Sequence, residues 1–415
     1  MAKTQLPHSS PASPKLSLIG ASALGVASML GAGVFVVFAP ASELAGSYLF
    51  LAIGIAGVVA ALNARSMRQL SKVFPRAGGA YAFGKEYLSS NWGFLAGIAF
   101  ILGKVGSVAA IALAAASYIY PEAKVEVAFA SLALMTGINV LGINRTATGA
   151  LLLSVPTVAL LLLVGISGFQ VAAGESQDQS SIAGILPAAA LIFFAFAGYA
   201  RVATLGPEVK DPSENIPKAI TLSLVFVIAI YFLVSNALQA QLGKALQFSI
   251  APIQDFAAIA LPWLPAQLVV LVAATACLGS LLSLLAGISR TAEAMAKDRE
   301  IPRFIGLRSK RFDSPWVADL LILSIASALL VSGDITWTIG ISSFAVLVYY
   351  AIANLAAFRQ LHSKQPVGRV LALLGAALCL GVGFFVPVES LLVTTVTLAV
   401  AMGLRAGLIM RRLSS

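Results

Sequence analysis

The chain has 415 residues, of which 59% are hydrophobic and only 11% are charged, and its mean hydropathy is +0.94. A soluble domain carries about 25% charged and about 45–50% apolar residues. Soluble enzymes, secreted domains and disordered proteins are therefore excluded, and an all-α polytopic membrane protein is expected. The formal net charge of +10 is explained by the Lys and Arg of cytoplasmic loops and not by a nucleic-acid surface.

The elements expected in chain order begin with a tail. Residues 1–15 are polar and rich in Ser and Pro, which predicts a disordered cytoplasmic tail that is not a cleaved signal peptide. A hydrocarbon core of about 30 Å then needs about 20 helical residues per span. Twelve apolar stretches meet this length: 16–40, 47–70, 91–120, 125–143, 150–172, 183–206, 217–240, 263–291, 316–333, 335–358, 368–387 and 389–410.

Positive charges are divided unevenly between the loops that these spans create. With the N-terminus inside, 23 of the 27 Lys and Arg residues fall in inner segments, and only Lys124 and Lys244 fall in outer loops. This asymmetry predicts that the N- and C-termini are both cytoplasmic. The short loops favour a bacterial cell (inner) membrane. The two remaining cations, Lys104 and Arg201, lie inside spans.

Two of the spans carry small residues where a membrane helix can break. The first span contains Gly31, Ala32 and Gly33, and the sixth contains Ala197 and Gly198. The two spans are five apart, as a 5+5 inverted repeat requires. Unwound backbone exposes N–H groups that suit a carboxylate and carbonyl groups that suit an ammonium. Glycine also serves close helix packing, so the breaks predict an amino-acid site only together with the motifs around them.

Four motifs mark these breaks and the inner loops. They are Gly31-Ala32-Gly33-Val34-Phe35; Phe74-Pro75-Arg76-Ala77-Gly78-Gly79-Ala80-Tyr81; Phe193 to Gly198 with Glu208-Val209-Lys210-Asp211-Pro212 and Ile216-Pro217-Lys218-Ala219-Ile220; and Met295-Ala296-Lys297-Asp298 with Ile301-Pro302. In this order and at these topological positions, the motifs resemble those of the amino acid–polyamine–organocation (APC) superfamily of permeases. One residue departs from the pattern, because Arg299 stands where the family usually has Gly.

The resemblance implies a LeuT-like fold of 12 transmembrane helices. Residues 16–362 would form the inverted-repeat transport core of spans 1–10, and residues 363–415 would hold two additional C-terminal helices and the tail. It also implies a secondary active transporter, not an enzyme, that moves amino acids by alternating access. The family's substrate contacts fall on Met29, Leu30, Gly31, Ala32, Gly33, Phe193, Phe194, Phe196, Ala197 and Gly198.

Some of these positions carry a more specific expectation. The gating aromatic falls on Phe194, or on Phe196 if the alignment shifts, and Gly198 is the hinge glycine. Ala32 stands where many members have Ser, so only backbone donors remain for the carboxylate. Ser280 and Ser283 stand where sodium-coupled relatives place hydroxyl ligands, although small serines are also ordinary packing residues.

The two intramembrane cations are functional candidates, because a charged side chain within a span is costly. Many proton-coupled or sodium-independent relatives have a lysine in span 5, where this chain has none. We therefore expect Lys104, midway along span 3, to replace it as a fixed cation or as a proton carrier. A lysine that reaches an interface or caps carbonyls is the structural alternative. For Arg201 three roles are open: a contact to the substrate carboxylate, an ion pair with Glu208, or a lock of the inner gate.

The distribution of charge also bears on the substrate. No acid lies at mid-membrane, whereas two cations do. Because a cationic substrate would gain from an acid near its distal charge, neutral amino acids are expected, with a proton, or sodium, as the coupling ion. A cationic amino acid or polyamine transporter or exchanger is the alternative, since carbonyls and aromatic rings also hold cations. No cofactor, metal or nucleic acid is expected, and the partners are the substrate and the lipid bilayer.

Overall fold

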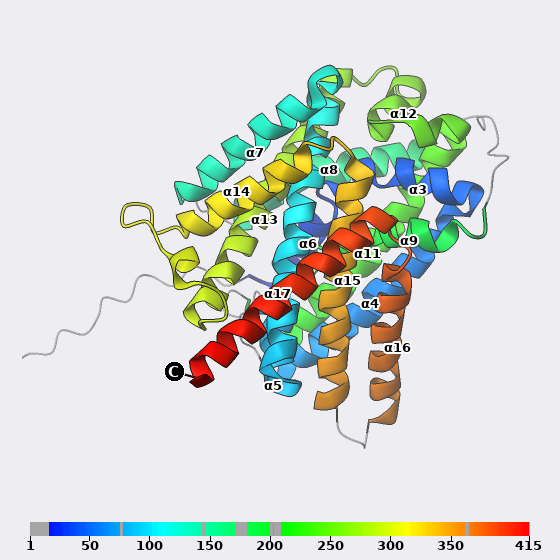
Figure 1. Cartoon of the computed structure of the whole chain (residues 1–415). Helices are drawn as coiled ribbons and strands as arrows, with labels where there is room; N and C mark the ends of the chain where they lie inside the picture. The colour runs from blue at the N-terminus through cyan, green and yellow to red at the C-terminus, as the bar shows by residue number, and fades with distance from the viewer. Residues whose placement is uncertain are drawn as a thin grey trace, which may run out of the picture.

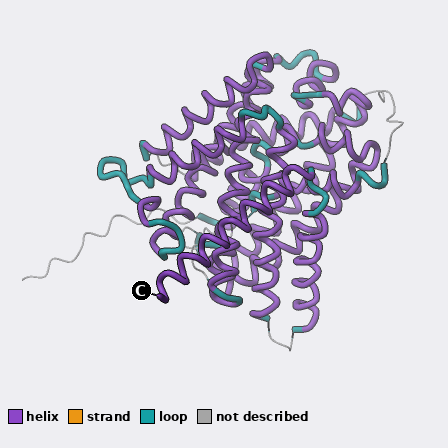
Figure 2. The backbone as a smooth tube through the Cα atoms, in the orientation of Figure 1, coloured by secondary structure: helices purple, strands orange, loops and turns teal. Residues whose placement is uncertain are grey.

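A computed structural model of the chain describes residues 16–74, 78–142, 147–170, 181–199, 202, 209–361 and 365–414. Within these ranges the backbone is helical apart from its loops and one isolated bridge between Leu16 and Val209. Figure 2 shows the helices joined by short connections into one bundle. The all-α membrane architecture expected from composition is therefore confirmed.

The α-helices are α1 (Leu18–Met29), α2 (Gly33–Val36), α3 (Phe38–Ala45), α4 (Leu49–Val73), α5 (Ala80–Tyr87), α6 (Ser90–Ile119), α7 (Lys124–Val140), α8 (Ala147–Ser167), α9 (Ile185–Phe196), α11 (Pro212–Leu242), α12 (Pro252–Ala260), α13 (Ala266–Lys297), α14 (Trp316–Leu330), α15 (Ile335–Gln360), α16 (Pro366–Gly383) and α17 (Val388–Ser414). Short 3₁₀ turns η1 (Gly46–Tyr48), η2 (Pro121–Ala123), η4 (Gly243–Phe248) and η5 (Arg303–Gly306) join some of them.

The apolar helices of the structure lie where the sequence predicts membrane spans. Within the described ranges, nine helical stretches are long and apolar enough to cross a membrane, and three shorter apolar helices lie in α8, α9 and α14. Each of the twelve predicted ranges overlaps one of these stretches. The chain is thus a multi-pass membrane protein, while the count of twelve crossings and the inverted repeat stay predictions.

Helix α6 is the central pillar of the bundle and runs beside α15 (Figure 1). Gly103 and Gly106 of α6 make this approach possible, because a Cβ at Gly106 would lie 3.0 Å from the backbone nitrogen of Ser342. Ser107 and Ser342 then share a hydrogen bond of 2.6 Å between their hydroxyl oxygens. Small residues at such crossings let membrane helices gain dispersion energy. Lys104 is placed between these two glycines.

Two helices are interrupted inside the bundle. Helix α1 ends at Met29, and helical structure resumes only at Gly33, since glycine lowers helix propensity. Backbone hydrogen bonds continue past Val37, so that α2 and α3 form one run. Helix α9 ends at Phe196, where the N–H of Ala197 turns back to the carbonyl of Phe194 at 3.3 Å. Both interruptions fall at the breaks predicted from the sequence.

The second and fourth motifs contain residues with left-handed backbone. Gly78 and Gly79 have φ of +120° and +54°, a region that favours glycine. A side chain at Gly79 would also collide with the hydroxyl of Tyr349, which accepts a 3.0 Å hydrogen bond from the N–H of Ala80. Arg299 has φ of +61°, which explains why a glycine suits this position in the family.

Candidate functional site

The two broken segments touch each other through their backbones. A Cβ at Gly33 would lie 2.6 Å from the Cα of Ala195, where α2 begins against the last turn of α9. A Cβ at Gly198 would collide with the carbonyl oxygen of Ser28 in the last turn of α1. Only glycine fits at either crossing. The residues predicted around the two breaks are therefore brought together.

Tyr231 of α11 joins the two broken helices. Its ring is fully buried, and its hydroxyl oxygen lies 2.9 Å from the carbonyl oxygen of Met29 and 2.8 Å from that of Ala195. The single hydroxyl proton is shared between these two acceptors, one from each interrupted helix. The ring packs on Phe196 with centroids 4.9 Å apart. Tyr231 was not predicted from the sequence, although a tyrosine in the middle of an apolar span is a signal that its hydroxyl needs a partner.

The side chain of Lys104 lies at the C-terminal end of α9. Its side chain is buried, with the residue 6% exposed, and Nζ donates a 3.2 Å hydrogen bond to the carbonyl oxygen of Ala197. That carbonyl belongs to the C-cap of α9, where the helix dipole is negative. Among the described residues, no carboxylate lies within ion-pair distance of Lys104. The lysine thus caps the carbonyl end of α9, which is the contact that the structural alternative predicts.

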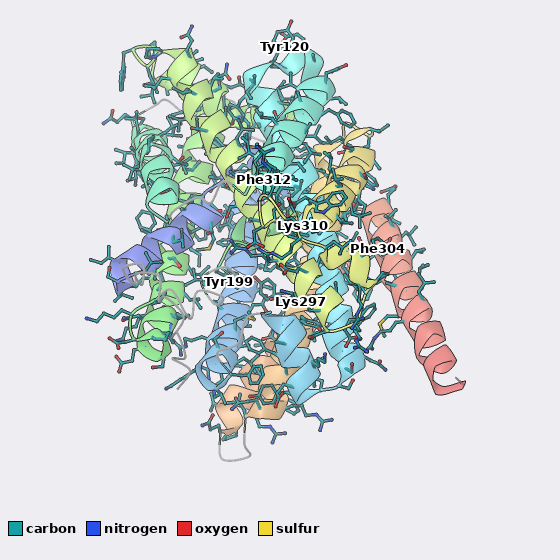
Figure 3. The ribbon with its side chains drawn as sticks, turned by 90° about the vertical axis from the view of Figure 1, so that its left-hand side faces the viewer. Tyr120, Tyr199, Lys297, Phe304, Lys310 and Phe312 are labelled. Carbon is teal, nitrogen blue, oxygen red and sulfur yellow. The ribbon has the colours of Figure 1, made fainter. Side chains whose placement is uncertain are left out.

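The aromatic candidates differ in how firmly they are packed. Phe193 is fully buried and meets Tyr350 edge-to-face at 6.0 Å, and Phe196 is held against Tyr231. Phe194 keeps 7% of its surface exposed. Tyr199, which ends the described part of this segment, lies inside the bundle and stacks on Tyr350 at 5.1 Å (Figure 3).

The remaining predicted residues fall into three groups. Met29, Leu30 and Ala32 are buried at the first break. Ser280 of α13 lies directly against Gly31, where any added Cβ would meet its hydroxyl, and Ser283 lies three residues further along α13. Arg201 lies outside the described residues, as does Glu208, its predicted partner. Within the described chain, no three His, Cys, Asp or Glu side chains cluster in a way that could hold a metal ion.

Comparison with known proteins agrees with this architecture. The amino acid permease family model matches residues 20–411. The chain belongs to the amino acid permease family. Uncharacterized transporters of Mycobacterium bovis and Mycobacterium tuberculosis are 40% identical to the permease over 385 residues, covering 91% of it and 87% of their own length. A vacuolar cationic amino acid transporter 4 of Arabidopsis thaliana is 27% identical over 408 residues, covering 90% of the permease and 64% of the plant protein.

These matches confirm the resemblance drawn from the four motifs. The family and the relatives are transporters, so the permease is a transporter and not an enzyme. The plant relatives are named for cationic amino acids, whereas the bacterial ones carry no substrate in their names.

The permease has a second polar region, where the second motif meets the fourth. Tyr81 donates a 2.5 Å hydrogen bond to Asp298, and Lys85 lies 3.1 Å from Asp298 and 3.3 Å from Glu300. Arg405 of α17 pairs with Glu300 at 2.8 Å. The hydrogen bond from Tyr81, with help from Lys85, holds the pKa of Asp298 below its ordinary value against the opposing effect of burial. Burial and the hydrogen bond to Asp298 raise the pKa of Tyr81, so its hydroxyl remains a donor.

Proposed function

We propose that the permease is a secondary active transporter of the cell (inner) membrane that moves neutral amino acids by alternating access, coupled to protons. Both termini are cytoplasmic in this proposal, and twelve spans form a LeuT-like 5+5 repeat with two additional C-terminal helices. The observation that carries the proposal is the Lys104 ammonium on the Ala197 carbonyl, inside a crossing of two interrupted helices. That crossing offers backbone groups of both polarities in one place.

The backbone of the two breaks would clamp the substrate. The N–H groups at Gly31, Ala32 and Gly33, at the start of the α2–α3 run, suit the carboxylate of an amino acid. The carbonyl groups that end α9, from Phe193 to Ala197, suit its ammonium. Phe194, the less tightly packed aromatic, is the gate over the substrate, and Gly198 is the hinge.

Lys104 would couple the substrate to a proton. Its ammonium takes a carbonyl that a substrate ammonium also needs, and two cations on one buried oxygen repel strongly in a medium of low dielectric. Substrate binding therefore favours the loss of the proton from Lys104 or the movement of its side chain. Either event ties the protonation of one lysine to occupancy of the clamp.

The test of coupling uses Lys104→Met and Lys104→Ala in proteoliposomes, with uptake measured against external pH and with an imposed proton gradient. We expect either variant to lose the response to the gradient, because the proton carrier is gone. Lys124→Met, which removes a lysine at the start of α7, is the matched control and should behave as wild type. Uptake by Lys104→Met with unchanged pH dependence would reject the coupling role.

A cationic amino acid or polyamine is the second candidate substrate class. It is favoured by the Arabidopsis relatives, which are named as cationic amino acid transporters and are 24–27% identical to this permease. Counterflow with labelled alanine, leucine, arginine and putrescine separates the two classes. We expect exchange of alanine or leucine, because no acid of the described residues faces the Lys104 ammonium. A preference for arginine or putrescine over alanine would replace the neutral proposal by the second.

Sodium is the alternative coupling ion, through Ser280 and Ser283. The same vesicles, loaded in choline or sodium buffer at one pH, distinguish the two ions. Uptake that needs sodium and falls in Ser280→Ala would assign the coupling to these serines. Uptake that is indifferent to sodium and follows the proton gradient supports Lys104.

A further inference from the structure

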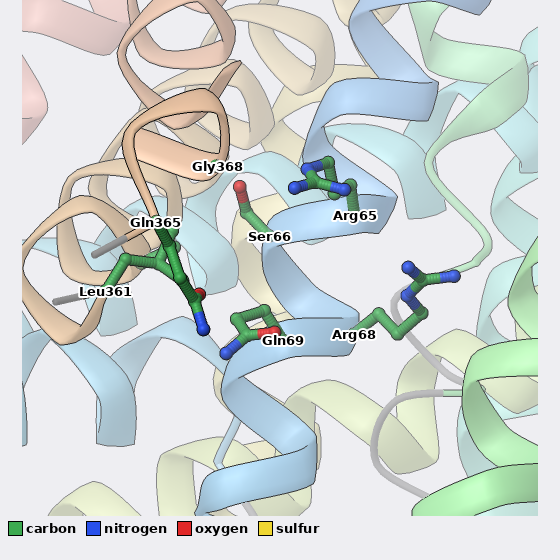
Figure 4. Close-up of a pocket in the computed structure, with 8 residues that line it drawn as sticks. Arg65, Ser66, Arg68, Gln69, Leu361, Gln365 and Gly368 are labelled. Atoms are coloured by element: carbon green, nitrogen blue, oxygen red, sulfur yellow. The ribbon is translucent and has the colours of Figure 1, made fainter. Parts of the chain in front are cut away.

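A polar cleft opens between three helices away from the broken segments. It is lined by residues of α4, α15 and α16 and of the connection between the last two (Figure 4). Its empty space is about 330 Å³, part of which is open to the solvent. The lining residues are Arg65, Ser66, Arg68, Gln69, Ala357, Leu361, Gln365 and Gly368. Most of these side chains are polar, and every charged one is positive.

The two arginines have no carboxylate partner in the described part of the chain. The ion pairs in that part of the chain are made by Lys85, Lys218, Lys297, Arg308 and Arg405. Gln69 is fixed by a 3.1 Å hydrogen bond from its amide nitrogen to the side-chain oxygen of Gln360. Ser66 is only 3% exposed, and its hydroxyl points across the cleft towards Gly368 (Figure 4). The guanidinium of Arg65 lies on the side of Ser66 and α16, whereas that of Arg68 points away from α16 (Figure 4). An unpaired guanidinium beside a buried hydroxyl calls for an anion with several oxygen atoms.

The start of α16 completes the donor set. No side chain caps this end of the helix, and Pro366 occupies its first turn, so the next backbone N–H groups have no acceptor within the helix. Gly368 keeps this end open to Arg65, because a Cβ there would lie 3.4 Å from a terminal nitrogen of Arg65 and 3.2 Å from Leu361. The partial positive charge of the helix end adds to that of the guanidinium groups.

The surroundings of the cleft are those of a membrane interface. On α16, Val367 and Val370 next to the cleft are 70% and 63% exposed, as expected of a lipid-facing surface. The positive-inside prediction places this end of the bundle at the cytoplasmic leaflet, where anionic lipids and cytosolic phosphates both occur. We propose that the cleft between α4, α15 and α16 is a binding site for an anionic phosphate group, held by Arg65, Ser66 and the start of α16, with the positive charge of Arg68 close by.

The experiment measures the shift in thermal unfolding midpoint of the purified permease as a ligand is titrated. The probes are dihexanoyl phosphatidylglycerol, dihexanoyl phosphatidylcholine and inorganic phosphate, at constant ionic strength. We expect saturable stabilisation of the wild type by phosphatidylglycerol. In the double variant Arg65→Gln/Arg68→Gln, the apparent affinity should be at least about tenfold weaker. Stabilisation by inorganic phosphate that equals the lipid effect and needs the same arginines would identify the source as free phosphate instead of a headgroup.

Two further variants keep the test decisive. Arg359→Gln removes an exposed arginine of α15 that does not line the cleft, and it should bind as wild type does. Gly368→Val retains both arginines but fills the cleft, so it should lose the stabilisation even if the double arginine variant does not fold. Equal stabilisation of wild type, Gly368→Val and the arginine variant by every probe would overturn the proposal, as would an equal loss in Arg359→Gln.

Discussion

Charged side chains have different partners at the centre of the bundle and at one end of it. At the centre, Lys104 is buried and rests on one carbonyl, that of Ala197, at 3.2 Å. At the end, Lys85 is shared between the carboxylates of Asp298 and Glu300 at 3.1 and 3.3 Å, and Arg405 pairs with Glu300 at 2.8 Å. The centre is built from backbone and one unpaired charge, and the end is built from side chains that pair with one another.

The difference follows from the cost of burying charge. In a low-dielectric interior an ion pair saves little over apolar packing, whereas an unpaired cation is tolerated only where helix carbonyls face it. The centre is therefore sensitive to small changes of shape, because its contacts are backbone atoms at glycine crossings. The end has redundant partners and side chains that can adjust. Changes at the centre should thus cost more than changes at the end.

The largest effect is expected from Gly198→Ala. Its new Cβ would collide with the carbonyl oxygen of Ser28, which is backbone and cannot swing aside. We expect destabilisation of about 1–3 kcal/mol and loss of most transport, because the segment that follows α9 is forced away from α1. Uptake in proteoliposomes and the unfolding midpoint measure both effects. Gly287→Ala, where nothing lies within 4 Å of the added Cβ, is the control and should unfold no earlier than wild type; wild-type transport by Gly198→Ala would break the comparison.

An intermediate effect is expected from Tyr231→Phe. The ring and its contact with Phe196 remain, but the carbonyl oxygens of Met29 and Ala195 lose their shared donor. Buried acceptors left without a donor cost about 1–3 kcal/mol. Thermal unfolding should show this loss, whereas Tyr120→Phe, at a tyrosine that is 53% exposed, should unfold as wild type does. If the two variants unfold alike, the hydroxyl does not tie the interrupted helices together.

The sequence predicted the positions of these features better than their contacts. Gly31, Gly33 and Gly198 identified the breaks because glycine disfavours helix locally, and local effects are readable along the chain. The apolar stretches predicted helices that the structure contains. Long-range partners are set by three-dimensional packing, so neither the bond from Lys104 to Ala197 nor that from Tyr81 to Asp298 could be derived from spacing.

The same limit applies to residues that carry no local signal. Tyr231 is one of nine tyrosines, and nothing near it in sequence shows that it faces two interrupted helices 36 and 202 residues away. Arg299 is the reverse case. Its departure from the family glycine was visible in the sequence, but only the φ of +61° gives that position a physical meaning.

The smallest effect is expected at the end of the bundle, from Asp298→Asn. The pKa of Asp298 is lowered by Tyr81 and Lys85, so its carboxylate stabilises the fold at pH values above the unfolded pKa of about 3.9. That contribution is lost as pH falls through the lower folded-state pKa. Because the carboxyl side chain is 46% exposed, screening should keep the effect below about 1 kcal/mol.

Unfolding midpoints of wild type and Asp298→Asn should therefore differ slightly at pH 7 and approach each other as pH falls below about 3.9, and added salt should narrow the difference at pH 7. Lys85→Gln removes the cation from the other side of the pair and should follow the same pH dependence, with Arg405 still holding Glu300 at 2.8 Å. A difference that persists unchanged at pH 3 would mean that shape, not charge, holds this end together. Both regions would then depend on the shape of their contacts, and the contrast between them would fail.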